Sequence, residues 1–412
     1  MNEAVFKNYS RGLLLGAALL LLATAAFNRL VDPFQYFGTP RISGFNEVKS
    51  RLRFFEREVK PAVVKREQPE AVILGSSIAA IGFEPLHPAL TGEGRTKSYN
   101  FAFSGATWKE TYCALEYVLA NTDAKRIVFG ILDHAMPEED CGRNLEAMNE
   151  NRLPEVLVSP QAIHHSNKTL RSQNPGEPLT HTAEGRYLFS RNDPRVEHRT
   201  QVFFEANLQG KATCSEDRLR HSLDEPTAPL ALDTSTPLDL SGLSHMLKQV
   251  SGRDIQLRIV LYPRHVVGAE AYYLCGEEQH RWLVMDRVAR YIEQHPPVPP
   301  ASVELWEFQG YGPPFAEPLD GGVLTYWQDT IHFNPELGDR MLDAMFSSGG
   351  EAPDPVTGFG YRVNTATLAA RHRWLSDQRR AFLQSHPETW DTLMRLVPAE
   401  MQRSQPAMPQ GG

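Results

Sequence analysis

The sequence lacks three features that would each have indicated a class of protein. Its four cysteines lie far apart with no Cys-x-x-Cys pair, which excludes zinc-ribbon and thioredoxin-type motifs. Lys and Arg number 42 against 50 Asp and Glu, a net charge of −8, so the basic balance typical of nucleic-acid-binding proteins is missing. Only one segment is apolar enough to enter a bilayer, which excludes a multi-pass transporter. With 41% hydrophobic and 22% charged residues over 412 positions, the chain has the composition of an ordinary globular protein.

The one apolar run, Gly12–Phe27, lies near the N-terminus. Lys7 and Arg11 precede it, and by the positive-inside tendency they keep the start cytoplasmic and place the rest outside. The 16 residues of the run are slightly fewer than the roughly 17–25 of a typical spanning helix. The aromatic residues of Asp32-Pro33-Phe34-Gln35-Tyr36-Phe37 are typical of a membrane-interface exit, which favours an anchor that is retained.

Two other interpretations of this run stay open. Ala23-Thr24-Ala25 is an A-x-A sequence of the kind at which signal peptides are cleaved. A buried core helix is the third interpretation, although nothing at this end of the chain supplies a polar face. The anchor and the cleaved signal both place the body of the protein outside the cytoplasm.

Export would place the four cysteines in an oxidising space, where they can form up to two disulfides. Cys141, Cys214 and Cys275 lie in polar, loop-like stretches, and we expect at least one disulfide among these three. Cys113 lies in a helical pattern and is expected to be a small core residue instead.

Short β-branched or apolar runs alternate with helical patterns along the middle of the chain. The predicted strands are Ala71–Gly75, Ser98–Phe101, Arg126–Leu132, Leu257–Tyr262 and Val303–Trp306. Helical patterns such as Trp108–Ala120 and His280–Glu293 fall between them. This alternation predicts an α/β fold, a parallel sheet with helices on both faces.

Two breaks in the alternation divide the chain. Residues 139–233 are rich in Pro, Asn, His, Ser and Arg and are predicted to form a long insertion, and residues 347–360 are predicted to be a linker. The predicted organisation is an anchor or uncleaved signal at 1–35, a connecting helical segment at 36–67, a main domain at 68–346, a helical extension at 347–400 and a disordered tail at 401–412.

The first candidate for chemistry is a pair of serines after the first predicted strand. Gly75-Ser76-Ser77 puts two hydroxyls at the carboxyl end of that strand, where open α/β sheets place their sites. Serines at this position are also common caps of the following helix, so the segment alone does not distinguish the two roles.

The second candidate is an Asp/His pair late in the chain. Asp329 and His332 are three residues apart, so a single irregular turn can bring the carboxylate to the imidazole. Asn334-Pro335 is a typical start of a helix, which puts the pair in the loop before the last sheet-packing helix. A histidine oriented by a carboxylate is what a serine hydroxyl needs to lose its proton at neutral pH. A capped loop with a solvent-exposed histidine is the alternative.

Together the two segments resemble the SGNH (GDSL-like) hydrolase superfamily over roughly residues 68–346. The resemblance implies a three-layer α/β/α, flavodoxin-like fold. It also implies that Ser77, in the third place of the family's Gly-Asp-Ser, is the nucleophile, with His332 as general base and Asp329 as its orienting carboxylate. The stretch 100–105 resembles the family's second block, so the backbone N–H groups of Gly105 and Ser77 are the expected oxyanion-hole donors.

The third block of the family is Gly-x-Asn-Asp, and here it ends Gly130-Ile131-Leu132-Asp133. Leu132 cannot donate the hydrogen bond of the family's Asn, which argues against efficient free hydrolysis. The departure, the Gly-Ser-Ser form and the N-terminal run resemble a membrane-anchored branch that handles acyl groups on cell-surface polymers, which includes alginate O-acetylation and teichoic-acid D-alanylation proteins.

This resemblance implies a single-pass protein of the bacterial inner membrane with a periplasmic catalytic domain. The implied activity is O-acyl (acetyl) transfer on a cell-envelope or exported polysaccharide, with a membrane-bound acyltransferase as partner. A plain esterase or lipase is the alternative among enzymes. A non-catalytic envelope scaffold with the same fold is the alternative outside them, and Leu132 is its best support.

Three further residues are candidates for substrate contact. Arg264 and His265 follow the fourth predicted strand at the same sheet edge, and Trp327 lies beside the Asp/His pair. Ordinary loop and core roles are the alternatives. His134 beside Asp133 and the pair His164-His165 lack a third ligand at a suitable spacing, so neither a metal nor another cofactor is expected.

Overall fold

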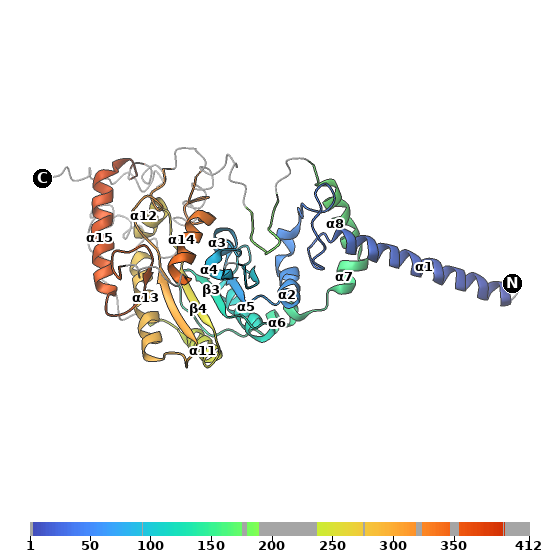
Figure 1. Ribbon diagram of the computed structural model, residues 1–412, viewed down its shortest axis with the longest axis horizontal. Coiled ribbons are helices and arrows are strands. Elements are labelled where there is room, and N and C mark those ends of the chain that lie inside the picture. The colour runs from blue at the N-terminus through green and yellow to red at the C-terminus, as the bar shows by residue number, and fades with distance from the viewer. Residues whose placement is uncertain are drawn as a thin grey trace.

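The computed structural model describes residues 3–92, 94–174, 179–188, 237–274, 277–318, 324–346, 354–389 and 391. Its centre is a six-stranded sheet in the order β2-β1-β3-β4-β5-β6 (Figure 1). The strands are β1 (Ala71–Leu74), β2 (Ser98–Asn100), β3 (Arg126–Ile131), β4 (Gln256–Leu261), β5 (Ser302–Glu307) and β6 (Tyr361–Arg362). The first five are mutually parallel, and β6 pairs antiparallel with β5 at the edge. The fold is therefore α/β with a mostly parallel sheet, as predicted.

Alternate strand residues contribute to two separate apolar cores. Val72, Leu74 and Ile127 belong to the core formed with α5 (Trp108–Asn121), α11 (Ser241–Val250) and α13 (Glu277–Gln294). Ile73 and Val128 belong to the core formed with α3 (Ser77–Gly82), α4 (Pro88–Thr91), α12 (Val266–Leu274) and α14 (Pro335–Phe346). Strands buried on both sides need continuous apolar runs, which is why all five were visible in the sequence.

The region predicted as an irregular insertion begins with three helices. These are α6 (Gly142–Asn149), α7 (Leu153–Val158) and α8 (Pro160–Arg171). Ser159 caps α8 by accepting a hydrogen bond from the Ala162 amide at 3.0 Å. A Ser-Pro helix start was therefore present in the sequence, although the weak periodicity of the region concealed it.

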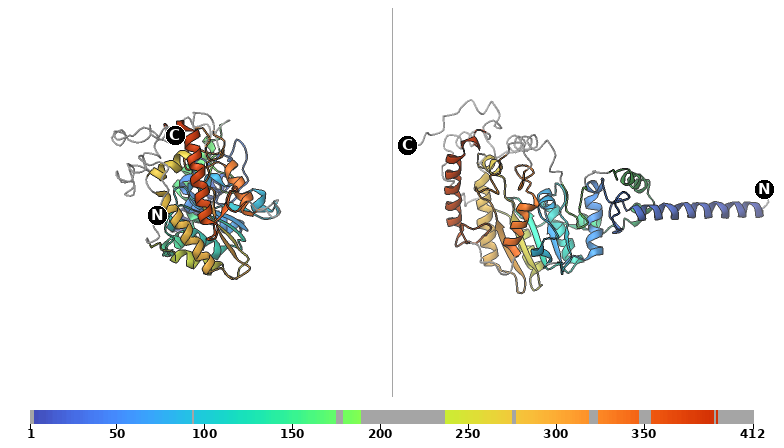
Figure 2. Two further views of the ribbon diagram at one scale, coloured as in Figure 1. Left: turned by 90° about the vertical axis from the view of Figure 1, so that its left-hand side faces the viewer. Right: turned by 45° about the horizontal axis from the view of Figure 1, so that its top comes forward.

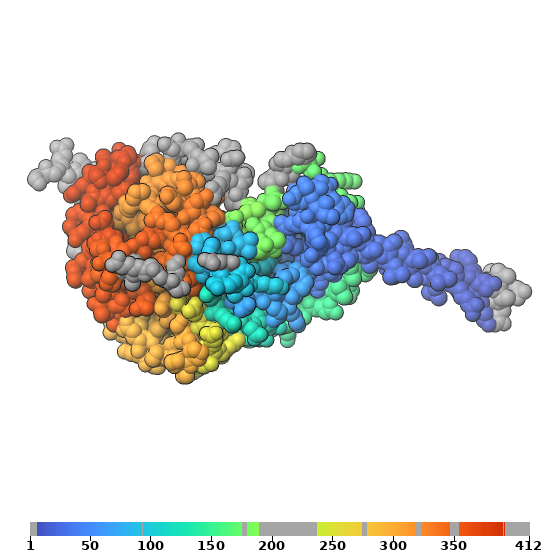
Figure 3. Space-filling view, in the orientation of Figure 1, coloured from blue at the N-terminus to red at the C-terminus, as the bar shows by residue number. Residues whose placement is uncertain are grey.

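The long N-terminal helix α1 (Glu3–Val31) projects from one end of the body, as Figures 1 and 3 show. Residues Phe6–Val31 are long and apolar enough to cross a membrane. Its last turns are bound to the body, since the Asn28 side chain donates to Leu157 O at 2.8 Å and accepts from Ser166 Oγ at 2.7 Å. The buried Lys49 ammonium donates to Val31 O and Asp32 O at 2.9 and 2.7 Å, which satisfies carbonyls that a helix C-terminus leaves unpaired. Helix α2 (Glu56–Glu67) then leads into β1.

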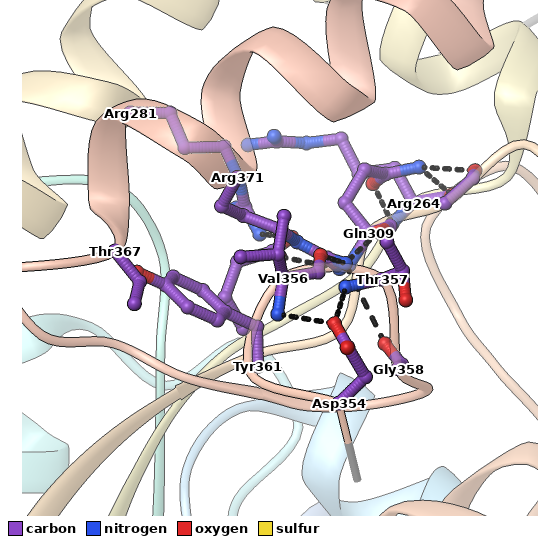
Figure 4. A network of polar contacts seen from close by, with 12 residues as sticks. Arg264, Arg281, Gln309, Asp354, Val356, Thr357, Gly358, Tyr361, Thr367 and Arg371 are labelled. Atoms are coloured by element: carbon purple, nitrogen blue, oxygen red, sulfur yellow. Dashed lines mark hydrogen bonds and ion pairs between the residues drawn. The ribbon is translucent and has the colours of Figure 1, made fainter.

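The C-terminal segment is tied to the sheet by buried ion pairs. The Glu307 carboxylate at the end of β5 lies 3.4 Å from Arg281 of α13 and 3.3 Å from Arg371 of α15 (Leu368–Ser385). Arg371 also donates to Gln309 O and Val356 O, and Figure 4 shows it at the centre of this network. Figure 2 shows α15 along the end of the body opposite α1. Residues from 354 to 385, predicted to be linker and extension, therefore pack on the sheet.

One disulfide lies within the described residues. Cys113 of α5 is bonded to Cys141, which precedes α6, with Cα atoms 5.4 Å apart. The chain after β3 folds back over the start of α5, where Trp108 Nε1 donates to Pro137 O at 2.9 Å, and this brings Cys141 to the helix. The interpretation of Cys113 as only a core residue is wrong, because it is both buried and bonded. Cys214 and Cys275 lie outside the described residues.

Candidate active site

The two serines that follow β1 have different surroundings. Ser76 is the N-cap of α3, and its Oγ accepts a hydrogen bond from the Ile78 amide at 3.4 Å. Ser77 is the first residue of the helix, and its Oγ lies 2.8 Å from His332 Nε2. Gly75 allows this sharp turn because its φ of +147° is rarely adopted by L side chains, and a Cβ there would collide with the Tyr262 hydroxyl. The local geometry thus gives Ser76 a capping role and brings Ser77 to the imidazole.

Ser77, His332 and Asp329 form a continuous hydrogen-bonded relay. The Nδ1 atom of His332 lies 2.7 Å from Asp329 Oδ2, on the other side of the ring from Ser77. Both His332 and Asp329 are buried, at 8% and 2% exposure, while Ser77 is partly exposed. With Nδ1–H donating to the carboxylate, Nε2 has its lone pair available to accept the serine proton. The two segments lie more than 250 residues apart in sequence, and the sheet brings them to one edge.

The Asp329 carboxylate is held in its ionised state. Burial on its own would raise the pKa of Asp329, but His332 and the amides of Ile331 and His332 outweigh burial and lower it. Those amides donate to Oδ1 at 2.9 and 2.8 Å, which leaves Oδ2 for the imidazole. The loop is therefore built to keep a charged, oriented carboxylate behind the histidine.

Asn334 fixes the loop that carries this pair. Its buried amide donates to the carbonyls of Leu324, Thr325 and Trp327, all within 3.1 Å. The backbone N–H of Gln328 donates to His332 O at 2.7 Å and closes the loop. Pro335 begins α14, so the predicted helix start is confirmed.

The segment after β2 packs beside the serine turn. The buried Asn100 side chain donates to Ala79 O at 3.0 Å, and the Phe103 amide donates to Gly75 O at 3.1 Å. The Ala106 amide donates to Phe103 O, which closes a β-turn with Gly105 at φ +65°. Gly105 is exposed, and within the described ranges neither its N–H nor that of Ser77 donates to a protein acceptor. Both amides are thus available at this edge.

Strand β3 presents Leu132 next to the same edge. Leu74 of β1 pairs with Phe129 of β3, so the turn that carries Ser77 and the residue Leu132 both follow the carboxyl ends of neighbouring strands. Leu132, which directly follows the buried strand, is 42% exposed. It therefore presents an apolar side chain at this edge.

Arg264, His265 and Trp327 lie below the surface. They are 3%, 2% and 1% exposed. Arg264 pairs with Asp133, and its guanidinium lies 3.7 Å from the centre of the Tyr272 ring. His265 Nε2 lies 2.7 Å from Glu317 O and Trp327 Nε1 donates to Pro314 O at 2.6 Å. These contacts stabilise the sheet edge, and they give no support to the expected substrate contact.

Tyr262, at the end of β4, was not singled out in the sequence. Its buried hydroxyl accepts a hydrogen bond from the Ser76 amide at 3.3 Å. The ring occupies the space that a Cβ at Gly75 or Gly130 would need, so both glycines are required for its position. The sequence signal for this position of Tyr262 is a Gly at the end of each of two neighbouring strands, together with a Tyr at the end of the third.

No group of three or more His, Cys, Asp or Glu side chains able to hold a metal ion is found in the part of the chain that the structure describes. Comparison with known proteins adds nothing to the geometry: no protein-family model, curated protein or solved structure matches the chain at a significant level.

Proposed function

We propose that the protein is an extracytoplasmic acyl-ester enzyme that uses Ser77, His332 and Asp329 as a catalytic triad. The observation that carries this proposal is the relay of two hydrogen bonds, 2.8 Å from Ser77 Oγ to His332 Nε2 and 2.7 Å from His332 Nδ1 to Asp329 Oδ2. A capped loop with a solvent-exposed histidine does not account for it, because His332 is buried and its ring nitrogens face a hydroxyl and a carboxylate.

In the proposed mechanism, Ser77 Oγ attacks the carbonyl carbon of an acyl donor while His332 Nε2 takes the hydroxyl proton. Asp329 stabilises the imidazolium that forms. The backbone N–H groups of Ser77 and Gly105 stabilise the tetrahedral oxyanion. Its collapse breaks the bond to the leaving group, which receives the proton from His332, and leaves an acyl-serine. An acceptor hydroxyl then gives its proton to His332 and attacks the acyl-serine. The bond between the acyl carbon and Ser77 Oγ breaks, and Oγ takes the proton back from His332, which regenerates both residues.

We favour transfer to a sugar hydroxyl over transfer to water. Leu132 removes one oxyanion donor of the SGNH family, and loss of one such donor costs about 10²–10³ in rate in a well-studied protease. We infer that the mostly parallel α/β sheet belongs to a three-layer SGNH-like fold. The resemblance to membrane-anchored acylation proteins then supports O-acyl (acetyl) transfer on a cell-envelope or exported polysaccharide. A membrane-bound acyltransferase that supplies acyl groups is the corresponding partner.

The geometry of α1 supports a retained anchor in the bacterial inner membrane, with the body in the periplasm. The run Gly12–Phe27 covers about 24 Å as a helix, whereas a hydrocarbon core is about 30 Å thick. With the flanking residues of the span Phe6–Val31 the helix covers about 39 Å, which places its last turns close to the membrane surface where they enter the body. Exposed apolar side chains lie on the elements around that point, at Leu30, Ile42, Leu153, Val158 and Ile163. The Cys113–Cys141 disulfide fits an oxidising compartment.

A serine-reactive phosphonate probe tests the proposal on the full chain. We expect labelling at Ser77, a loss of labelling of at least 10³-fold in Ser77→Ala and in His332→Ala, and a double variant hardly worse than either single one. Ser76→Ala is the matched control, because it removes only the helix cap and costs about 1 kcal/mol of stability. Labelling at Ser76 would move the nucleophile by one residue.

The non-catalytic scaffold is the rival that Leu132 favours. It predicts no labelling of the wild-type chain and unchanged behaviour of Ser77→Ala in cells. A plain esterase instead predicts that water competes fully with sugar hydroxyls for the acyl-serine.

A further inference from the structure

The turn that carries Gly105 is held from outside the sheet by the first turn of α2. Glu56 Oε2 accepts the Ser104 amide at 2.8 Å, and Arg57 Nη2 donates to Ser104 O at 3.2 Å. Both hydrogen-bonding groups of one backbone residue are therefore bound by adjacent side chains of a single helix. Neither contact belongs to the triad.

The peptide between Ser104 and Gly105 is the central peptide of the β-turn that begins at Phe103. In a trans peptide the C=O and the following N–H point in opposite directions, so a contact to Ser104 O also orients the Gly105 N–H. Turns of types I and II differ mainly by a flip of this central peptide, and glycine at the third position permits the flip. Without an external contact, the Gly105 N–H would be free to turn away from the edge.

Glu56 belongs to a buried charge cluster with Lys60 and His181. The three side chains are each about 1% exposed. His181 Nε2 lies 2.9 Å from Glu56 Oε1, Lys60 Nζ lies 3.9 Å from it, and Lys60 also donates to Ala102 O at 2.6 Å. Burial would raise the pKa of Glu56, but Lys60, His181 and the Ser104 amide outweigh it and lower the pKa to about 2. Burying charged side chains costs free energy of folding. The contacts of this cluster to Ser104 N–H and Ala102 O therefore point to a role in fixing the backbone of this segment.

Arg57 is fixed from a different direction. Its guanidinium bonds the Glu110 carboxylate, and Glu110 is itself part of the capping box of α5 with Thr107. Arg57 is 43% exposed at its side chain, so it is not needed to fill the core. The buried cluster, through Glu56, and the more exposed Arg57 thus both hold Ser104.

We propose that Glu56 and Arg57 are positioning residues for the Gly105 N–H. Arg57 holds the Ser104–Gly105 peptide through Ser104 O, and Glu56 fixes the preceding peptide through the Ser104 N–H, so that together they direct the Gly105 N–H to the oxyanion. This inference rests on the proposed function, since it concerns the same site. It assigns to α2, the helix that follows the membrane-proximal segment, a part in the rate of acyl transfer.

The test separates the rate of the chemical step from binding. For the phosphonate probe on the full chain in detergent, the maximal rate constant of labelling and the probe concentration at half-maximal rate are measured separately. We expect Arg57→Ala to lower the rate constant about tenfold, less than the loss of a whole donor, and to leave the half-maximal concentration within twofold. Added guanidinium at millimolar concentration should restore part of the rate. Lys65→Ala, an exposed basic residue of the same helix, is the matched control.

The Glu56 variants separate positioning from stability. The amide oxygen of Glu56→Gln still accepts from Ser104, so its rate constant should stay within about threefold while its melting temperature falls because Lys60 loses its counter-charge. Glu56→Ala removes the acceptor and should lower the rate constant as much as Arg57→Ala or more. Glu58→Gln is the control on the same turn.

Wild-type rate constants in folded Arg57→Ala, or equal rate losses in Glu56→Gln and Glu56→Ala, would overturn the inference. Failure of the proposed function looks different, because the wild-type chain itself then shows no labelling at Ser77.

Discussion

The carboxyl edge of the sheet carries two polar assemblies that use the same kinds of residues in opposite ways. Where β1, β2 and β3 end, the Asp329 carboxylate faces an imidazole, and the relay ends on the partly exposed hydroxyl of Ser77. Where β5 ends, the Glu307 carboxylate faces the guanidinium groups of Arg281 and Arg371, all of them buried. The first assembly has an end at which chemistry can occur, and the second is closed on itself.

The difference lies in what neutralises the carboxylate. A guanidinium stays protonated, so the Glu307 cluster can only hold the chain together. An imidazole can gain and lose a proton near neutral pH, so the Asp329 pair can pass one on. The two assemblies should therefore respond in opposite ways to removal of their carboxylates.

The largest expected effect is on reactivity at Asp329. Asp329→Asn should lower the phosphonate labelling rate about 10³–10⁴-fold, as in a protease whose triad Asp was changed to Asn, because the wrong histidine tautomer is then favoured. The melting temperature should change little. Asp343→Asn, on the more exposed part of α14, is the control. A loss of less than tenfold would contradict a triad role for Asp329.

The reverse result is expected at Glu307. Glu307→Gln removes the carboxylate that pairs with two buried guanidinium groups and should lower the free energy of unfolding by about 3–5 kcal/mol. Labelling of Ser77 in the folded fraction should stay within a few-fold of wild type. Denaturant unfolding followed by fluorescence measures the first, and the probe measures the second. Glu70→Gln is the control, because Glu70 pairs with the exposed Lys125 at 3.3 Å and surface pairs contribute at most about 1 kcal/mol.

A substitution at Leu132 tests whether an added hydrogen-bond donor at this edge raises the rate of ester hydrolysis. If Leu132 occupies the proposed third donor position, Leu132→Asn adds an amide donor there and should raise the rate of hydrolysis of a simple acetyl ester about 10–100-fold. Steady-state hydrolysis of p-nitrophenyl acetate measures it, with Leu132→Ala as the variant that frees space but adds no donor. Equal rates in the two variants would mean that Leu132 does not occupy the donor position.

The most gradual expected effect concerns pH and the buried histidines. Burial lowers the pKa of His265 to about 4 and that of His181 to about 4, even though hydrogen bonds to Glu317 O and Glu56 oppose it. The histidines of the unfolded chain therefore bind protons near pH 6.5, whereas the two buried histidines of the folded chain stay neutral until the pH approaches 4. The free energy of unfolding is therefore highest above about pH 6.5 and decreases as the pH falls towards 4. Each histidine should contribute at most about 1.4 kcal/mol per pH unit in that window.

Unfolding free energies from pH 7.5 to 4.5 measure this slope. His265→Gln should remove one proton from the uptake that accompanies unfolding, which makes the slope shallower by up to about 1.4 kcal/mol per pH unit. An equal slope in His265→Gln would show that His265 takes up its proton in the folded state.

The strands and the Asp329/His332 pair could be predicted from the sequence because each depends on a few adjacent residues. Apolar runs such as Ile127–Phe129 can only be satisfied inside a sheet that is covered on both faces, and Asp329 reaches His332 within one turn. The meeting of Ser77 with His332 was expected from family resemblance, and parallel strands explain it, since their carboxyl ends share one edge.

The partners that surround the site depended on contacts between distant segments. Nothing near Cys113 in sequence indicated Cys141, and nothing near Gly105 indicated Glu56 and Arg57, which lie almost 50 residues earlier. Local patterns decide which residues enter strands, helices and caps, because the hydrogen bonds involved reach only a few residues. Which buried charge faces which backbone group is decided only when the helices pack, because that choice depends on the angle and distance between whole elements.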